Sequence, residues 1–367
     1  MRTILYSVPL ALALGGLPAR PVGPAPTVAP SFAVIAYYAG DATGFQQYPV
    51  QKLTHLIYSF LHLQGTALAF DNLRSQATVA ALVALKAQHP QLKVLLSLGG
   101  WGGCQTCSQV FATEQGRTAF AASVRQVLLA SHADGIDLDW EYPAIAGPPG
   151  HRFAPEDRHN FTLLVQALRA TLGSAYEISF AAGGFPEYLR NSVEWAAVMP
   201  LVDRVNLMSY DLVNGYSTTT GHHTPLYSTP QQQASVDNGV RYLDSMGVAP
   251  GKIVIGAAFY ARVFSGVSPA GQGLRQAGKF EKAINYKDFA DSLSPARGFV
   301  TYWDQVAQAP YAYNARRHEF ASFDDAQSIR LKTQYARAKH LGGIMFWELT
   351  GDKPRRGLLD ELYQATR

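Results

Sequence analysis

Short apolar runs rich in β-branched and aromatic residues alternate with longer segments of helical periodicity, and this alternation is the strongest constraint on the fold. It is typical of repeated βα units, whose strands form a parallel sheet. We predict eight strands, at residues 33–38, 55–61, 93–98, 135–140, 177–182, 204–209, 252–259 and 342–347, with helices at 117–131, 157–172, 232–246 and 326–340. This α/β pattern over 367 residues indicates a TIM (β/α)8 barrel, whose active site lies at the C-terminal ends of the strands.

The spacing between the seventh and eighth predicted strands departs from this repeat. About eighty residues separate them, many more than one connecting helix needs. Residues 262–322 are rich in Gly, Pro, Tyr and Phe and contain strand-like pieces such as 298–303. We therefore predict that residues 31–367 form a catalytic barrel with a small α+β subdomain inserted at 262–322, which stands on the barrel rim and forms one wall of a cleft.

The segment DGIDLDWEYP, residues 134–143, places three carboxylic acids at alternate positions of a predicted strand. Because side chains alternate between the two faces of a strand, Asp137, Asp139 and Glu141 would share the inner face of the barrel. The apolar residues between them would face the surrounding helices. The alternation thus agrees with the barrel and predicts a row of acids that leads to its catalytic end.

Three carboxylates within about 13 Å along one strand repel one another if all are ionised in a half-buried site. At least one of them must hold a proton. Glu141 lies nearest the mouth, so we expect it to be a general acid whose pKa is raised by burial and by Asp139. A solvated acidic edge is the alternative, but the apolar residues of the same strand disfavour it.

The composition argues against several other classes of function. The 31 Lys and Arg residues are scattered and form no run suited to a nucleic-acid backbone. His222 and His223 are adjacent and cannot both face one site from a strand, and the other histidines show no metal-ligand spacing. The sequence LGGWGG lacks the Lys and Ser or Thr of a phosphate loop. We expect no nucleic acid, no metal and no cofactor.

The N-terminus has the order of a signal peptide. Arg2 precedes an apolar stretch at residues 4–17, and a proline-rich run follows at 18–30. A membrane anchor is the alternative, but the stretch is shorter than the roughly 20 residues of a spanning helix and contains Pro9. We therefore predict a signal peptide and spacer in residues 1–30, no membrane anchor, and a secreted protein, extracellular or periplasmic.

Cys104 and Cys107 are the only cysteines and form a C-x-x-C pair. Zinc would need two more ligands, and a redox pair would need a helix start in a cytosolic setting. Given export, we favour a small structural disulfide.

The acidic segment resembles the D-x-x-D-x-D-x-E signature of glycoside hydrolase family 18, with Asp134, Asp137, Asp139 and Glu141 in register. The resemblance continues in KVLLSLGGW on the third strand, MSYDL at residues 208–212 and GGIMFWEL at 342–349. It covers the chain from about residue 33 onward. It implies a retaining enzyme that uses the acetamido group of its substrate as nucleophile and carries a chitinase insertion domain.

The resemblance also implies a role for each matching residue. Glu141 would protonate the leaving oxygen and later activate water. Asp139 would orient the acetamido group as it closes to an oxazolinium ion, and Asp137 would share a proton with Asp139. Tyr210 would hydrogen-bond the N-acetyl oxygen, and Asp211 would contact the bent sugar.

Aromatic residues would complete the sugar site. Trp347 would floor it, and its walls and surroundings would come from Tyr142, Trp101, Tyr37, Phe60, Tyr260 and Arg262. The last two are expected to end the seventh strand. Met208 is expected to pack beneath the site. Ser97 would donate to Asp137, or else bond to backbone, and Arg262 would contact substrate, or else pair with a rim carboxylate.

The expected substrate is chitin or chitooligosaccharides, acted on by a monomer. An endo-β-N-acetylglucosaminidase acting on N-glycans is one alternative, because that chemistry uses the same signature. A chitin-binding lectin on the same fold is another, but such lectins lose the catalytic acid and Glu141 is present.

Overall fold

The computed structural model describes residues 32–367. The signal peptide and spacer predicted for residues 1–30 lie outside this range. Within it, no helix is both long and apolar enough to cross a membrane.

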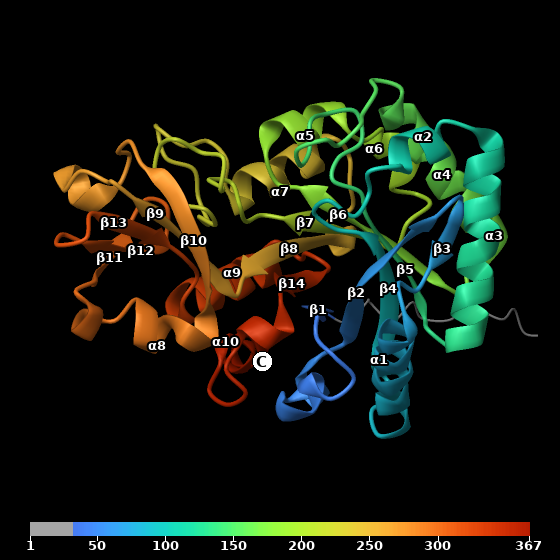
Figure 1. Cartoon of the computed structure of the whole chain (residues 1–367), viewed down its shortest axis with the longest axis horizontal. Helices are drawn as coiled ribbons and strands as arrows, with labels where there is room; N and C mark the ends of the chain where they lie inside the picture. Colours follow the sequence, from blue (N-terminus) through green and yellow to red (C-terminus); the bar gives the residue numbers. More distant parts are fainter. Residues whose placement is uncertain (1–31) are drawn as a thin grey trace, which may run out of the picture. The chain divides into compact units, whose positions relative to one another are not determined.

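Parallel strands form a closed barrel at the centre of the protein (Figure 1). Its eight strands are β1 (Ala33–Tyr38), β2 (His55–Gln64), β4 (Lys93–Gly99), β5 (Gly135–Asp139), β6 (Glu177–Gly183), β7 (Arg204–Met208), β8 (Ile253–Ala258) and β14 (Gly343–Trp347). They pair in the order β1-β14-β8-β7-β6-β5-β4-β2, and the pairing of β1 with β2 closes the ring. The predicted TIM barrel is confirmed. β5 is shorter than expected and ends at Asp139, so Trp140 and Glu141 follow the strand.

Helices surround the barrel. The longer ones are α1 (Leu73–Ala84), α3 (Glu114–Ser131), α4 (Asp157–Leu172), α7 (Val236–Ser245), α9 (Ala326–Ala338) and α10 (Leu358–Ala365); α2 (Cys107–Phe111), α5 (Pro186–Asn191) and α6 (Trp195–Val198) are short, and β3 (Ala67–Ala69) extends β2 as a hairpin. Two helices begin at a different residue from the one predicted. α3 begins earlier because Thr113 accepts a hydrogen bond from the Gly116 amide, and α7 begins later because Ser235 caps it through the Asn238 amide.

The strand residues divide between two apolar cores, as the alternation predicts. Ile136, Leu138 and Trp140 are buried in the layer between the strands and the helices. Alternate residues of other strands, including Ile35 and Met345, fill the interior of the barrel. The acids of β5 therefore lie on the inner face, where little water reaches them.

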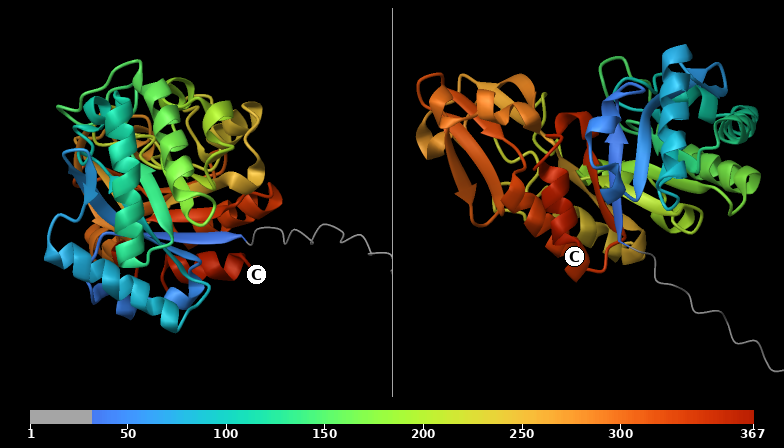
Figure 2. Two further views of the ribbon diagram at one scale, coloured as in Figure 1. Left: turned by 90° about the vertical axis from the view of Figure 1, so that its right-hand side faces the viewer. Right: turned by 90° about the horizontal axis from the view of Figure 1, so that it is seen from below.

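A second sheet lies between β8 and β14 in the sequence, as predicted. Its five antiparallel strands are β9 (Tyr260–Ser265), β10 (Lys279–Asn285), β11 (Val300–Asp304), β12 (Ala309–Asn314) and β13 (Glu319–Ser322), in the order β10-β9-β13-β12-β11, with the short helix α8 (Phe289–Ser292). It stands to one side of the parallel strands (Figure 2, orange). One detail of the prediction is wrong. Tyr260 and Arg262 do not end the seventh barrel strand but lie on β9, so the inserted sheet itself carries them.

An ionic cluster fills the N-terminal end of the barrel, opposite the acids. Glu177 pairs with His55, Lys93 and Arg204, and each of the four residues comes from the start of a different strand. Burial opposes ionisation of Glu177, but the hydrogen bond and charge of His55 and the charge of Arg204 hold its pKa below the ordinary value. The cluster therefore joins β2, β4, β6 and β7 through one carboxylate.

Glu177→Ala should lower the free energy of unfolding by about 3 kcal/mol at pH 7, because the half-buried Arg204, the buried His55 ring and the exposed Lys93 lose their shared acceptor. Urea denaturation measures the change. Because the pKa of Glu177 is lower in the folded protein than in the unfolded chain, its stabilising effect is complete above the unfolded pKa and is lost as the pH falls towards the folded pKa. The difference in free energy of unfolding between wild type and Glu177→Ala should therefore become smaller in acid. The exposed Glu156→Ala is the control and should cost less than about 1 kcal/mol. Equal effects of both variants would contradict this role.

Candidate active site

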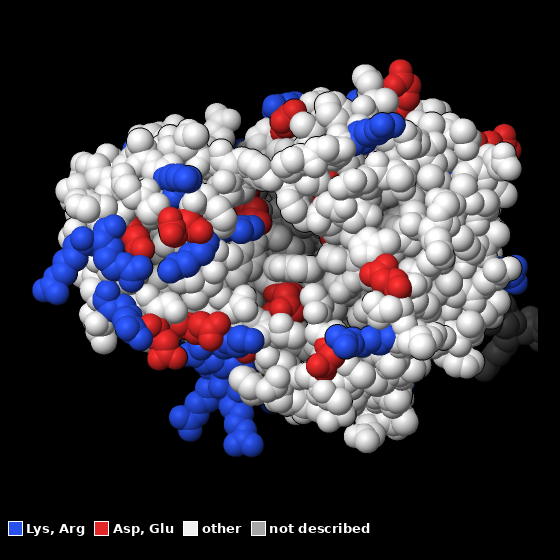
Figure 3. Space-filling model, viewed as in Figure 1, with Lys and Arg blue, Asp and Glu red and all other residues white. Residues whose placement is uncertain are grey.

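The three acids of the predicted row lie where β5 opens at the C-terminal end of the barrel. The exposed fraction rises along the row, from 0% for Asp137 through 4% for Asp139 to 9% for Glu141. The face of the molecule in Figure 3 is hollowed between the side of the inserted sheet and the side of the barrel, and acidic atoms are visible in the recess. Glu141 is thus the member of the row that a bound molecule reaches first.

Asp137 is held by donors from four strands. Tyr37 Oη and Ser97 Oγ donate to its Oδ2 at 3.0 and 2.9 Å. Ser179 Oγ and Asn206 Nδ2 donate to its Oδ1 at 2.6 and 3.1 Å. Burial still raises the pKa of Asp137 above its ordinary value, although all four donors oppose the rise. Of the two options for Ser97, the structure shows the bond to Asp137.

Asp139 lies in a different environment. Its Oδ1 is buried and has no hydrogen-bond partner among residues 32–367. Burial, with the charges of Glu141 and Asp137, raises the pKa of Asp139 well above its ordinary value. An unpartnered buried oxygen is costly, so this atom is ready to bind a ligand that supplies a donor or proton.

Glu141 has a pKa suited to proton transfer. Burial raises it to about 7, the charge of Asp211 adds to the rise, and the side chain of Tyr142 opposes it. Asp211, from the loop after β7, is thus a second negative charge that acts on Glu141, in addition to the charge interaction between Glu141 and Asp139. A group with this pKa can both give and take a proton near neutral pH.

Gly99, the last residue of β4, and Gly100 after it allow the following loop to pass close to the acids. Gly99 and Gly100 have φ of 107° and 79°, and the Gly100 amide donates to the Asp139 carbonyl at 2.9 Å. A side chain at Gly99 would collide with that carbonyl, and one at Gly100 with the Phe60 ring. The loop continues to Trp101, which is 51% exposed, and contains the predicted disulfide between Cys104 and Cys107.

The inserted sheet contributes directly to this site. Arg262 on β9 donates two hydrogen bonds to Asp211, from Nε at 2.7 Å and from Nη2 at 2.5 Å. Burial opposes ionisation of Asp211, but the hydrogen bonds and charge of Arg262, together with the His223 ring 3.5 Å away, lower its pKa below the ordinary value. The alternative role predicted for Arg262, pairing with a rim carboxylate, is the contact that the structure shows. Tyr260 packs edge-on against Tyr210 at a centroid distance of 6.2 Å.

Aromatic rings floor the site. Trp347, at the end of β14, stacks on Phe60 at 5.6 Å and lies 5.9 Å from Tyr37. A register shift between Ser59 and Leu61 takes Phe60 out of the ladder with β4. Met208 and Trp347 are both partly buried and pack against the apolar cluster in the barrel interior.

A second aromatic group lies beside the acids. Tyr142 meets Trp101 edge-on at 6.2 Å and also packs against Phe185 and Tyr188. The contacts thus join predicted site residues into two aromatic groups, one around Trp347 and one around Tyr142.

Sequence reasoning missed several neighbours of these residues. Tyr216 is 62% exposed and lies 6.0 Å from Trp101, so the two rings form an exposed pair. Ser179 is the register partner of Asp137 on β6, so aligning the predicted strands by register could have found it. Asn206 and His223 had no such signal. Asn206 is close to Asp137 only because the barrel closes, and His223 is close to Asp211 only because of the conformation of a loop. No group of three or more potential metal ligands lies within residues 32–367.

Comparison with known proteins assigns this barrel to a class. The sequence profile of the glycosyl hydrolases family 18 matches residues 33–352. Chitinase A1 of Niallia circulans is 36% identical over 294 aligned residues, covering 73% of this chain and 42% of that protein. A family 18 N-acetylglucosaminidase from Paenibacillus barengoltzii is 36% identical, with a TM-score of 0.84 over 91% of this chain and 100% of the other. A chitinase from Bacillus thuringiensis is 27% identical, with a TM-score of 0.85 over 92% of this chain and 70% of the other.

The fold and the row of acids are thus those of a glycosidase barrel. The chain belongs to glycosyl hydrolase family 18, which confirms the resemblance drawn from DGIDLDWEYP. It spans less than half of the length of the Niallia protein.

Proposed function

We propose that the protein is a chitinase, a retaining glycosidase that hydrolyses β-1,4-linked N-acetylglucosamine polymers with Glu141 as acid and base. The observation that carries the proposal is the position of Glu141 at the open end of a buried row of carboxyl groups, with a pKa of about 7. A protonated carboxyl at this position can deliver its proton to a leaving glycosidic oxygen. The same group, once ionised, can activate the water that completes hydrolysis.

The nucleophile in this proposal is the N-acetyl group of the substrate, as in other substrate-assisted enzymes of this family. Asp139 accepts the acetamido N–H on its unpartnered Oδ1, which orients the acetyl oxygen towards the anomeric carbon. Tyr210 donates its hydroxyl to that oxygen. Among residues 32–367 the only hydrogen-bond acceptor of this hydroxyl is Met345 Sδ at 3.8 Å, so it is available to a ligand. Ring closure to the oxazolinium ion places a positive charge beside Asp139 and Asp137, which stabilise it.

Asp137 lies below Asp139 in the row, farther from the open end of the barrel. Burial raises its pKa, so it can accept a share of the Asp139 proton while the ion forms, and its four donors hold it in position. Asp211, fixed by Arg262, contacts the distorted sugar and raises the pKa of Glu141.

The aromatic surfaces bind the sugar chain. Trp347 floors the subsite of the distorted sugar, and the exposed pair Trp101 and Tyr216 offers further flat faces to the chain. We propose that the sheet between β8 and β14 is a chitinase insertion domain spanning about residues 262–322, whose wall deepens the groove for a linear polymer. We also propose that residues 1–30 direct export and that the enzyme acts outside the cytoplasm as a monomer.

Product analysis on an N-acetylglucosamine hexamer, alongside a high-mannose glycoprotein, tests the proposal. We expect wild type to release dimers and trimers from the hexamer and no glycan. Glu141→Gln should lower kcat by at least about 10³-fold because the proton donor is lost, yet keep affinity for the hexamer within about threefold. Mass spectrometry measures the products and calorimetry the binding.

Glu156→Gln, on the exposed connection after β5, is the matched control and should be as active as wild type. Release of monomers alone would favour the N-acetylglucosaminidase activity named for the Paenibacillus neighbour. Glycan release alone would favour an N-glycan enzyme. Retained turnover in Glu141→Gln would exclude the mechanism, and cleavage of neither substrate by wild type would favour a binding protein.

The pH dependence follows from the raised pKa of Glu141. The acid form is active, so kcat/KM on the hexamer should fall as the pH rises through about 7 and then drop about tenfold per pH unit. Initial rates between pH 5 and 9 measure this limb. A profile that stays flat to pH 9 would show that Glu141 is not the titrating acid.

A further inference from the structure

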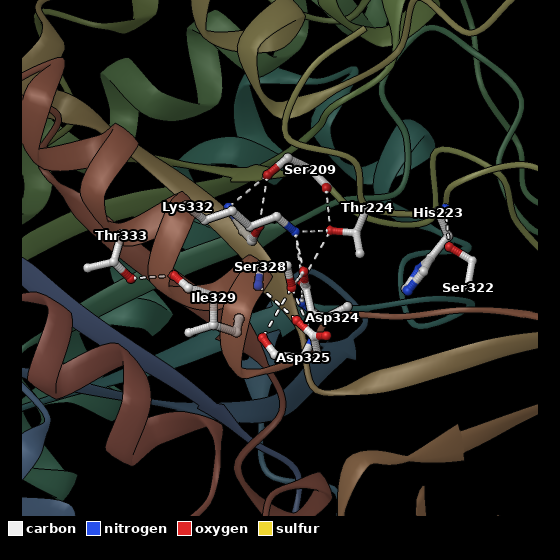
Figure 4. Close-up of polar contacts among 12 residues, drawn as sticks. Ser209, His223, Thr224, Ser322, Asp324, Asp325, Ser328, Ile329, Lys332 and Thr333 are labelled. Carbon is white, nitrogen blue, oxygen red and sulfur yellow. Dashed lines mark hydrogen bonds and ion pairs between the residues drawn. The ribbon is translucent and has the colours of Figure 1, made fainter. Parts of the chain in front are cut away.

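A buried ion pair lies next to the end of β8 and the loop after β7, outside the reacting groups. Lys332 and Asp324 are both 0% exposed. Lys332 Nζ donates to both Asp324 oxygens, at 2.8 and 2.7 Å, and to Thr224 Oγ1 at 2.5 Å (Figure 4). All three ammonium protons therefore have acceptors within residues 32–367.

The pair joins three separate parts of the chain. Lys332 lies on α9, and Asp324 lies on the segment that returns from β13 of the inserted sheet. Asp324 also accepts from the Ala258 amide, the last residue of β8, at 3.0 Å, and from Ser328 Oγ at 2.7 Å. The carboxylate is thus saturated with donors, which keeps the network in one arrangement.

Thr224 connects this pair to the substrate-binding motif. Thr224 Oγ1 accepts a hydrogen bond from Lys332, so its own hydroxyl proton can be donated elsewhere. The nearest acceptor is the Ser209 carbonyl, at 3.1 Å. That carbonyl belongs to the peptide bond that precedes Tyr210. The Ser209 hydroxyl is held from the other side, because it donates to the Gly256 carbonyl and accepts from the Gly256 amide, both at 2.9 Å.

Burying two charges is costly, and an apolar pair of similar volume is often as stable. Stability alone therefore does not account for this pair. We infer that Lys332 and Asp324 act through Thr224 as positioning residues, which fix the Ser209–Tyr210 peptide and so aim the Tyr210 hydroxyl at the N-acetyl group of the substrate. This inference rests on the proposed function.

The loop that carries Thr224 also holds Asp211. The His223 amide donates to Ser322 Oγ on β13 at 2.9 Å, its ring lies 3.5 Å from Asp211, and its carbonyl accepts from the Leu212 amide at 3.0 Å. The return segment of the inserted sheet thus supports both binding residues that follow β7.

Kinetics of three hydroxyl variants on the N-acetylglucosamine hexamer test the inference. Thr224→Val keeps the shape but removes the link, and we expect kcat to fall about tenfold with KM changed less than about threefold, because Tyr210 is misaligned in the transition state. Thr224→Ser restores the hydroxyl and should stay within about twofold of wild type. Thr333→Val is the matched control on α9, since Thr333 is equally buried but donates only to the Ile329 carbonyl.

All variants are assayed well below their melting temperatures, and Thr224→Ala replaces Thr224→Val if the latter does not fold. An unchanged kcat in the Thr224 variant, or an equal loss in Thr333→Val, would overturn the inference while the proposed function stands. If wild type itself does not cleave the hexamer, the proposed function fails and the inference fails with it. In that case wild type and every variant are inactive, whereas failure of the inference alone leaves wild type active.

Discussion

Barrel closure is the constraint on which the rest of this structure depends, because it sends alternate side chains of every strand into an interior with little water. On β5 those side chains are carboxyl groups. Four strands supply donors to Asp137 at the bottom of the row, whereas Asp139 above it has an oxygen with no partner in the described part of the chain. This difference separates an acid that is satisfied by the protein from acids that are available to a ligand.

The inserted sheet does more than form a wall. Its first strand carries Arg262, which fixes Asp211, and the charge of Asp211 contributes to the raised pKa of Glu141. Its return segment carries Asp324, which together with Lys332 and Thr224 supports the peptide before Tyr210. The first strand and the return segment of the insertion thus support Asp211 and Tyr210, which follow each other after β7. The insertion and the barrel therefore form one site.

Much of this could be predicted because strand alternation is a local property. The row Asp137, Asp139 and Glu141 follows from spacing alone, and barrel topology then places it at the catalytic end. Contacts that depend on barrel closure or on loop conformation could not be predicted. Asn206 of β7 donates to Asp137 across the barrel, and Tyr216 packs against Trp101 from a loop. The start of β9 was also missed, because the apolar run of β8 continues into Tyr260 without a turn residue.

The central claim is that the N-acetyl group of the substrate is the nucleophile, with Glu141 as the acid and base. Proton NMR of the anomeric signals, recorded in the first minutes of hexamer hydrolysis before mutarotation, tests it most directly. The account predicts that the new reducing ends appear as the β-anomer, because closure and opening of an oxazolinium ion invert the anomeric carbon twice. Initial appearance of the α-anomer would show a single displacement by water and contradict the account.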